Sequence, residues 1–267
     1  MLPPHAPVAP GLNVARNPEP EPIELSRWLA PGIAYIRFTS FPGDERTVAA
    51  ARQFMTEHAE ARTIIFDIRT HRGGGLAEMD AMLPALFAHP TDLVVMDTRS
   101  AVERVHGPIM PDGPTLRRAP SDADVVRRIH HVTPGADDRL FDADVVLLTS
   151  SMTGSAAEHF ALAMKRTHRA DLIGEATAGA NHFGGIAPVG TGFAAFIPVG
   201  RTYDPDTGQG WEGTGIPPTV EVRAEDALVE ALVRAGVSQA EATRLSAEVA
   251  PAGLMYRERG RPRPVAR

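Results

Sequence analysis

Short apolar runs alternate along the chain with longer segments in which apolar residues recur every three or four positions. The short runs predict β-strands at residues 33–38, 63–68, 93–96, 145–149 and 172–174. The longer segments predict amphipathic helices at residues 45–58, 76–88, 155–167, 225–235 and 238–249. Pro84 lies inside the second of these helices and is expected to shorten or kink it. Strands and helices that alternate in this way indicate an α/β fold.

The remaining segments set the domain organisation. Residues 193–199, a turn at 203–208 and apolar residues 219–222 predict a hairpin and a returning strand. The connection over residues 97–142 is long and rich in Pro, Asp and Arg, so we expect either a lid or a small insertion there. A proline-rich arm is expected over residues 1–22 and a mobile basic tail over residues 251–267. The core domain is therefore placed at residues 23–250.

Composition narrows the classes of function. Hydrophobic residues make up 43% of the 267 positions and charged residues 22%, which is typical of a folded globular protein. The formal net charge of -6 argues against a nucleic-acid partner, which would require a positive surface. No apolar run is long enough for a membrane span and the first residues do not resemble a secretory signal, so we expect a cytoplasmic protein without a membrane partner. Because the chain has no cysteine, a catalytic nucleophile must be an oxygen or a nitrogen atom.

A serine at a strand-to-helix turn is the first candidate for chemistry. The segment from Thr149 to Glu158 leaves an apolar strand, turns through a glycine and enters a helix at Ser155. The helix N-terminus could stabilise an oxyanion there, with the N–H of Ala156 as one donor. Ser155 and Glu158 also match a capping box, in which the serine only satisfies the backbone. The motif alone leaves both interpretations open.

A second turn contains three successive glycines, Gly73, Gly74 and Gly75, after the strand that ends near Asp67. Glycines allow the backbone to approach a ligand closely and leave N–H groups accessible, which suits a second oxyanion donor. An ordinary strand-to-helix turn would have the same composition.

Together these segments resemble the tail-specific, or C-terminal-processing, serine peptidase family, including its retinoid-binding and tricorn-core branches. The resemblance extends from about residue 32 to residue 228 and rests on the order of several motifs: Asp67-Ile-Arg69 with the glycine turn, the serine elbow, and residues 174–179, 197–201 and 211–218. It implies a core of repeated β-β-α units related to ClpP and crotonase. It also implies acyl chemistry, in which two backbone N–H groups bind the acyl oxygen.

The family's functional positions fall on named residues of this chain. The resemblance makes Ser155 the nucleophile and the N–H groups of Ala156 and Gly74 the oxyanion donors, with Gly73 as the alternative if the turn is shifted by one residue. It makes His182, in a loop, the general base, and Glu212 a group that orients the histidine or contacts substrate.

Lysine is excluded as the base by position. Lys165 is the only lysine, and it lies ten residues beyond Ser155 on the same predicted helix, about 15 Å along its axis. A general base must approach the serine oxygen to within roughly 3 Å, so Lys165 is disfavoured as the base.

This chain departs from the family pattern in three places. His71 stands where the family usually has Asn, which makes it a second candidate base. No histidine corresponds to the upstream catalytic histidine of the tricorn branch, because only His5 precedes residue 33. The segment between residue 33 and the glycine turn holds one helix, so no PDZ module is expected.

The leading hypothesis is a serine hydrolase that cleaves a peptide or another acyl substrate through an acyl-enzyme. One alternative is a catalytically retired module that binds a hydrophobic small ligand, and another is a non-peptidase enzyme that uses the same oxyanion hole for acyl or enolate chemistry. No cofactor is expected. No metal is expected either, because the adjacent residues His130 and His131 have no ligand at helical spacing. The sequence does not predict an oligomeric state.

Overall fold

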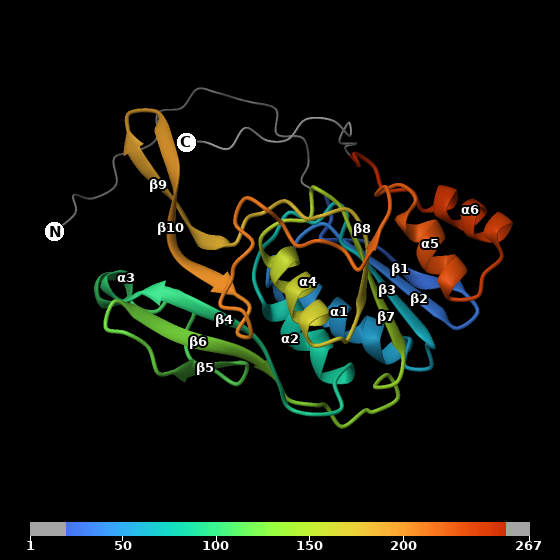
Figure 1. The fold of residues 1–267 in the computed structure, drawn as a ribbon, viewed down its shortest axis with the longest axis horizontal. Helices are drawn as coiled ribbons and strands as arrows, with labels where there is room; N and C mark the ends of the chain where they lie inside the picture. The colour runs from blue at the N-terminus through green and yellow to red at the C-terminus, as the bar shows by residue number, and fades with distance from the viewer. Residues whose placement is uncertain (1–19, 255–267) are drawn as a thin grey trace.

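The computed structural model describes residues 20–254, which form a mixed α/β fold with two β-sheets (Figure 1). The predicted fold class is therefore confirmed. The outer parts of the expected arm and tail lie outside the described residues. None of the helices within residues 20–254 is long and apolar enough to cross a bilayer.

The first sheet has six strands in the order β1-β2-β3-β7-β8-β11. Their bounds are Ile23–Ala30, Ile33–Phe38, Thr63–Asp67, Asp144–Thr149, Asp171–Gly174 and Val220–Glu221. Strand β1 pairs antiparallel with β2, and all the other pairs are parallel. Because parallel strands carry their carboxyl ends to one edge, the turns after β3 and β7 leave the sheet side by side.

Two layers of helices cover this sheet. On one face lie α1, α2 and α4, with bounds Glu45–Glu57, Ala77–Met82 and Ala156–Arg166. On the other face lie α5 and α6, with bounds Ala227–Arg234 and Gln239–Glu248. The strands alternate between the layers: Phe66 packs with α1 and α4, whereas Ile65 packs with α5. The central strands are therefore buried on both faces, which explains their continuous apolar runs.

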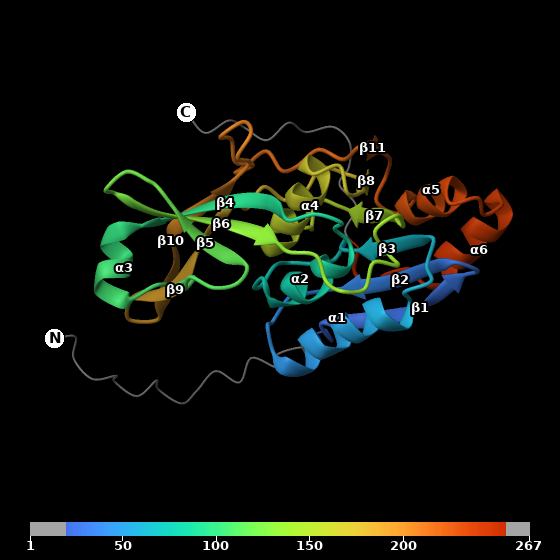
Figure 2. The ribbon, with the colours of Figure 1, turned by 90° about the horizontal axis from the view of Figure 1, so that it is seen from below.

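The second sheet has five antiparallel strands in the order β5-β6-β4-β10-β9. Their bounds are Leu116–Ala119, Val125–Val132, Thr91–Arg99, Phe193–Tyr203 and His182–Gly190. Helix α3, Ser100–His106, connects β4 to the segment that leads into β5. The sheet forms a second lobe beside the first (Figure 2). The long connection is thus folded. It forms helix α3 and contributes strands β5 and β6 to this sheet.

The structure contains five elements that the sequence did not predict: strands β1, β5, β6 and β9, and helix α3. The second predicted helix ends at Met82, and a short 3-10 helix at Leu83–Ala85 contains Pro84, which confirms the expected shortening. The partner of β10 is the preceding strand β9, whereas β11 pairs with β8 in the other sheet. Strand β9 was missed because its glycines and Pro188 hide the usual strand pattern.

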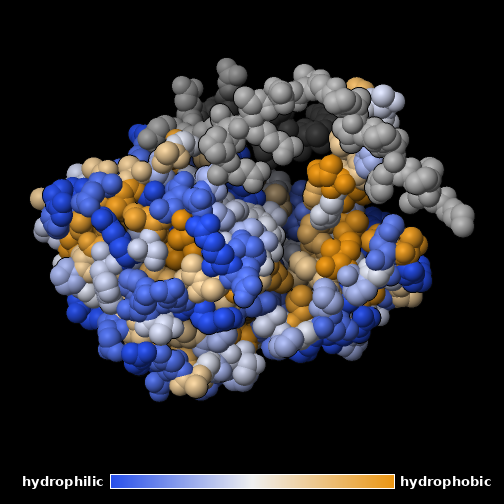
Figure 3. Space-filling model, turned by 180° about the vertical axis from the view of Figure 1, so that it is seen from behind, coloured by the Kyte–Doolittle hydropathy of each residue, from blue (hydrophilic) through white to orange (hydrophobic). Residues whose placement is uncertain are grey.

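The β9–β10 hairpin projects from the body of the protein (Figure 1) and exposes apolar side chains along its length (Figure 3). Its exposed large apolar residues are Ile186, Val189, Phe193, Phe196 and Ile197. The base of this hairpin carries His182, and the rest of the ribbon extends away from the first sheet.

Candidate active site

Ser155 occupies a constrained turn between β7 and α4. Its φ of 56° and ψ of -118° lie in a region that costs a non-glycine residue about 1–3 kcal/mol. The turn is held by a hydrogen bond from the Ser155 N–H to Glu158 Oε2, at 2.8 Å, and by one from the Gly154 N–H to the His71 carbonyl oxygen, at 3.0 Å. A strained serine at a strand-to-helix turn is an arrangement that presents a nucleophile.

The glycine turn packs directly against this serine. A Cβ atom on Gly73 would lie 2.8 Å from the Ser155 Cβ, and one on Gly74 would lie 2.0 Å from the Phe41 carbonyl oxygen. Both residues also have positive φ, 124° and 137°. No other residue type fits either position without a shift of the backbone.

The backbone N–H groups around the serine differ in their partners. The Gly73 N–H donates to His71 Nδ1 at 3.0 Å. Among residues 20–254, no acceptor is found for the N–H groups of Gly74 and Ala156. Both residues line the same pocket as Ser155. Two unpaired donors therefore lie beside the serine, one from each turn.

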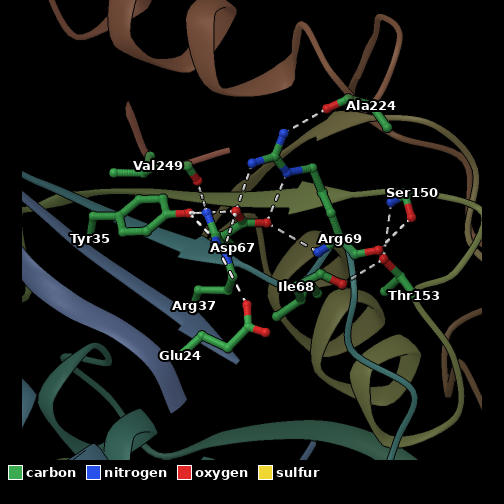
Figure 4. A network of polar contacts seen from close by, with 10 residues as sticks. All are labelled: Glu24, Tyr35, Arg37, Asp67, Ile68, Arg69, Ser150, Thr153, Ala224 and Val249. Atoms are coloured by element: carbon green, nitrogen blue, oxygen red, sulfur yellow. Dashed lines mark hydrogen bonds and ion pairs between the residues drawn. The ribbon is translucent and has the colours of Figure 1, made fainter. Parts of the chain in front are cut away.

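A buried ionic network fixes the start of the glycine turn (Figure 4). The Arg69 guanidinium donates to both carboxylate oxygens of Asp67, at 2.9 and 2.7 Å, and to the Ala224 carbonyl oxygen at 2.8 Å. Burial opposes the charge on Asp67, but Arg69, together with Arg37 and the Tyr35 hydroxyl, outweighs it and lowers the pKa of this carboxyl group. The ion pair is thereby retained in the core.

Two hydroxyl groups connect the glycine turn to the serine elbow. Ser150 Oγ donates to the Arg69 carbonyl oxygen at 2.5 Å, and Thr153 Oγ1 donates to the Ile68 carbonyl oxygen at 2.8 Å (Figure 4). The turns that follow β3 and β7 are therefore cross-linked, and the serine cannot move independently of the glycines.

Glu158 connects the serine elbow to the segment that precedes His182. Its side chain is fully buried and accepts four hydrogen bonds. The donors are the Ser155 N–H, the Thr177 hydroxyl, and the N–H groups of Gly179 and Ala180, at 2.6 to 2.8 Å. The capping-box glutamate of the sequence thus holds two loops as well as a helix terminus.

His182 and Glu212 form a half-exposed pair. Their Nδ1 and Oε2 atoms are 2.9 Å apart, and the same oxygen accepts from the N–H groups of Asn181 and His182. Partial burial opposes ionisation of Glu212, but the hydrogen bonds from His182 and Asn181 outweigh it and lower the pKa of the carboxyl group. A carboxylate on Nδ1 leaves Nε2 as the nitrogen that can accept a proton. His182 is the first residue of β9, and not part of a loop as the sequence suggested.

His71 is fully buried under the glycine turn. Its Nδ1 accepts from the Gly73 N–H, its ring packs edge-on against Phe41 at 4.2 Å, and its Nε2 has no partner among the described residues. Burial lowers the pKa of His71 to about 3. The imidazole is therefore neutral at physiological pH, with its proton on Nε2.

The candidate residues converge on one small pocket between the two lobes, with a volume of about 40 Å³. Ser155, Ala156, Gly74 and His182 line it, and Glu212 reaches it through His182. Lys165 lies elsewhere, with its Nζ donating to the Pro217 carbonyl oxygen at 2.6 Å. Apart from Glu212, Gly73 and the buried His71, the candidates from the sequence therefore line this pocket.

The sequence analysis missed His159, which also lines this pocket. It follows Ser155 by four residues on α4, so the helical spacing was the available signal.

Comparisons with known proteins found one matching sequence family and several structures of similar fold. The sequence model of peptidase family S41 matches residues 32–222. The photosystem II D1 C-terminal processing protease is a structural match at 22% identity and a TM-score of 0.52, covering 72% of this chain and 43% of that one. A putative peptidase from Parabacteroides merdae matches at 17% identity and a TM-score of 0.59, covering 82% of this chain and 66% of that one. Mature CPAF in complex with lactacystin matches at 14% identity and a TM-score of 0.56, covering 81% of this chain and 52% of that one.

This chain therefore spans about 43% to 66% of the length of these structures. The match to the family covers more than half of the chain and bears out the resemblance found in the sequence. The protein belongs to peptidase family S41.

Proposed function

We propose that this protein is a serine hydrolase that cleaves a peptide or related acyl substrate through an acyl-enzyme formed on Ser155. One observation carries the proposal: a serine in a strained turn shares a pocket with two unpaired N–H donors and with a histidine that is bonded to a carboxylate. A structural N-cap would require only a serine at the start of the helix, in an unstrained conformation.

The proposed roles rest on residue type, on the shared pocket and on the hydrogen bond between His182 and Glu212. Ser155 Oγ attacks the acyl carbon, and its proton passes to His182 Nε2, which returns it to the leaving group. Glu212 holds the Nδ1–H of His182 and stabilises the imidazolium that forms. The oxyanion accepts hydrogen bonds from the N–H groups of Gly74 and Ala156.

We assign His71 to positioning of the glycine turn. A general base works best with a pKa near the working pH, and burial holds the pKa of His71 at about 3. Its Nδ1 lone pair is also occupied by the Gly73 N–H, which leaves Gly74 as the oxyanion donor of this turn.

Reaction with a fluorophosphonate probe, followed by intact mass measurement, tests the proposal. We expect a single adduct on the native protein and none on Ser155→Ala or on heat-denatured protein, because only an activated serine displaces fluoride rapidly. A folded, accessible protein that forms no adduct would contradict the proposal and favour the ligand-binding alternative.

A further inference from the structure

A chain of three polar side chains leads from the surface to the wall of the catalytic pocket. Asp80 from α2, His130 from β6 and His159 from α4 are joined by hydrogen bonds of 2.9 Å, between Asp80 Oδ1 and His130 Nε2, and 2.7 Å, between His130 Nδ1 and His159 Nε2. The Thr115 hydroxyl donates to the other oxygen of Asp80 at 2.9 Å. Both imidazole rings are buried, and the mechanism proposed above uses neither of them.

The carboxylate and a neutral His130 ring together determine where each proton lies. A carboxylate only accepts hydrogen bonds, so His130 donates to Asp80 from Nε2, and in a neutral ring its Nδ1 is then an acceptor. His159 must then donate to this atom from its own Nε2. Burial lowers the pKa of His159, so its ring is neutral. The remaining nitrogen, His159 Nδ1, is therefore an acceptor with a free lone pair.

His159 lies next to the reacting serine. It is four residues along α4 from Ser155, and its backbone N–H donates to the Ser155 carbonyl oxygen at 3.0 Å. Its ring Nδ1 receives no hydrogen bond from the residues that the structure describes. Because Nε2 is already used by His130, Nδ1 is the only ring nitrogen that can serve a ligand in the pocket.

Most of the other side chains of the pocket are apolar, namely those of Leu76, Met96, Met110, Phe183 and Trp211, and Asn181 and Thr202 add polar groups. Asn181 Oδ1 is a second acceptor without a partner among the described residues, but it is buried. An acceptor in a largely apolar lining favours a small side chain with a hydrogen-bond donor over its apolar isostere.

We propose that the Asp80–His130–His159 chain makes His159 a specificity-determining residue, which accepts a hydrogen bond through Nδ1 from a hydroxyl group on the acyl part of the substrate. This inference rests on the proposed function, because the pocket is a substrate site only if Ser155 is the nucleophile. It predicts preference for a threonine-like over a valine-like side chain at the acyl position.

Two isosteric phosphonate probes test the preference. N-acetylated diphenyl phosphonates of threonine and valine differ only by a hydroxyl in place of a methyl group. In each reaction Ser155 Oγ forms a bond to phosphorus and the bond from phosphorus to phenoxide breaks. His182 takes up the serine proton and passes it to the phenoxide, which leaves as phenol. Intact mass measured against time gives the labelling rate. We expect the threonine probe to label about 3- to 10-fold faster, the worth of one neutral hydrogen bond.

Variants separate the acceptor from its support. His159→Phe keeps an aromatic ring but removes the acceptor, and His130→Phe removes the group that sets its tautomer, so both should reduce the rate ratio to about one. His131→Phe is the matched control on the same strand and should keep the preference of the native protein. Retention of the full preference in His159→Phe would overturn the proposal.

Nitrogen-15 NMR of the native protein checks the tautomer without any substitution. We expect His159 to carry its proton on Nε2 and to show an unprotonated Nδ1, and the opposite tautomer would overturn the proposal. Equal labelling by the two probes would overturn this inference and leave the proposed function intact. Failure of both probes to label Ser155 would overturn the proposed function, and this inference with it.

Discussion

The two parts of the candidate site are built in different ways. The serine elbow and the glycine turn leave the buried sheet and are held by Asp67, Arg69 and Glu158, whose side chains are almost fully buried. His182 stands at the base of an exposed hairpin, and its side chain and that of Glu212 are 43% and 52% exposed. The proposed nucleophile and oxyanion donors are thus held by the core, whereas the proposed base is held by a few contacts at the surface.

This difference separates stability from catalysis. Changes in the elbow and the glycine turn should alter both the free energy of unfolding and the activity, because buried polar groups lose their partners. Changes in the pair of His182 and Glu212 should alter activity alone, because exposed ion pairs contribute little to stability.

The largest expected effect is on the exposed side. His182→Gln should lower kcat/KM by about 100- to 10,000-fold, the usual contribution of a general base, while the melting temperature stays close to that of the native protein. Steady-state kinetics on a reactive ester and thermal unfolding measure the two quantities. Unchanged kinetics in His182→Gln would show that His182 is not the general base.

A pair of glycine substitutions compares the two regions directly. Gly74 in the turn and Gly190 in the hairpin share a φ of 137°, but a Cβ on Gly190 would meet no atom within 4 Å. Both alanine variants should lose about 1–2 kcal/mol from backbone strain. Gly74→Ala should lose a further 1–3 kcal/mol or so through its clash with the Phe41 carbonyl. Urea unfolding gives the free energy of unfolding of both variants. Equal losses of stability would show that the glycine turn accommodates a Cβ atom as easily as the hairpin does.

The effect that is smallest near neutral pH, and grows as the pH falls, is that of His71 on stability. His71 has a pKa of about 3 in the folded protein and about 6.5 when unfolded, so below pH 6.5 the unfolded chain binds a proton that the folded one does not. The folded state therefore loses up to about 1.4 kcal/mol per pH unit as the pH falls from 6.5 toward 3.

His71→Asn removes this titration while keeping a side-chain acceptor for the Gly73 N–H. Urea unfolding at several pH values between 7 and 4 should show a shallower loss of stability in the variant than in the native protein. The other buried histidines are common to both proteins and cancel in the difference. Parallel curves would show that His71 takes up its proton without unfolding.

Much of the fold could be predicted from local patterns. The central strands were found because burial on both faces produces apolar runs. The shortening of the second predicted helix was expected because Pro84 lacks a backbone donor. The partner of β10 was not found, because the glycine-rich strand β9 carries no such pattern.

The candidate site shows the same division. Ser155, Gly74 and Ala156 could be proposed because two turns marked by glycines and a helix start carry recognisable residue patterns and match motifs of a known family. The contact between His130 and His159 joins residues 29 positions apart, and no spacing rule connects a strand of one sheet to a helix on another.

The sequence by itself determined the α/β class and the resemblance to a peptidase family, since these depend on periodicity and on motifs of a few adjacent residues. Only the tertiary structure decided which N–H groups remain unpaired, that His71 is buried and neutral, and that His159 faces the same pocket as the serine. Hydrogen-bond partners and burial are set by chain segments that meet only when the two sheets and the helices between them have packed.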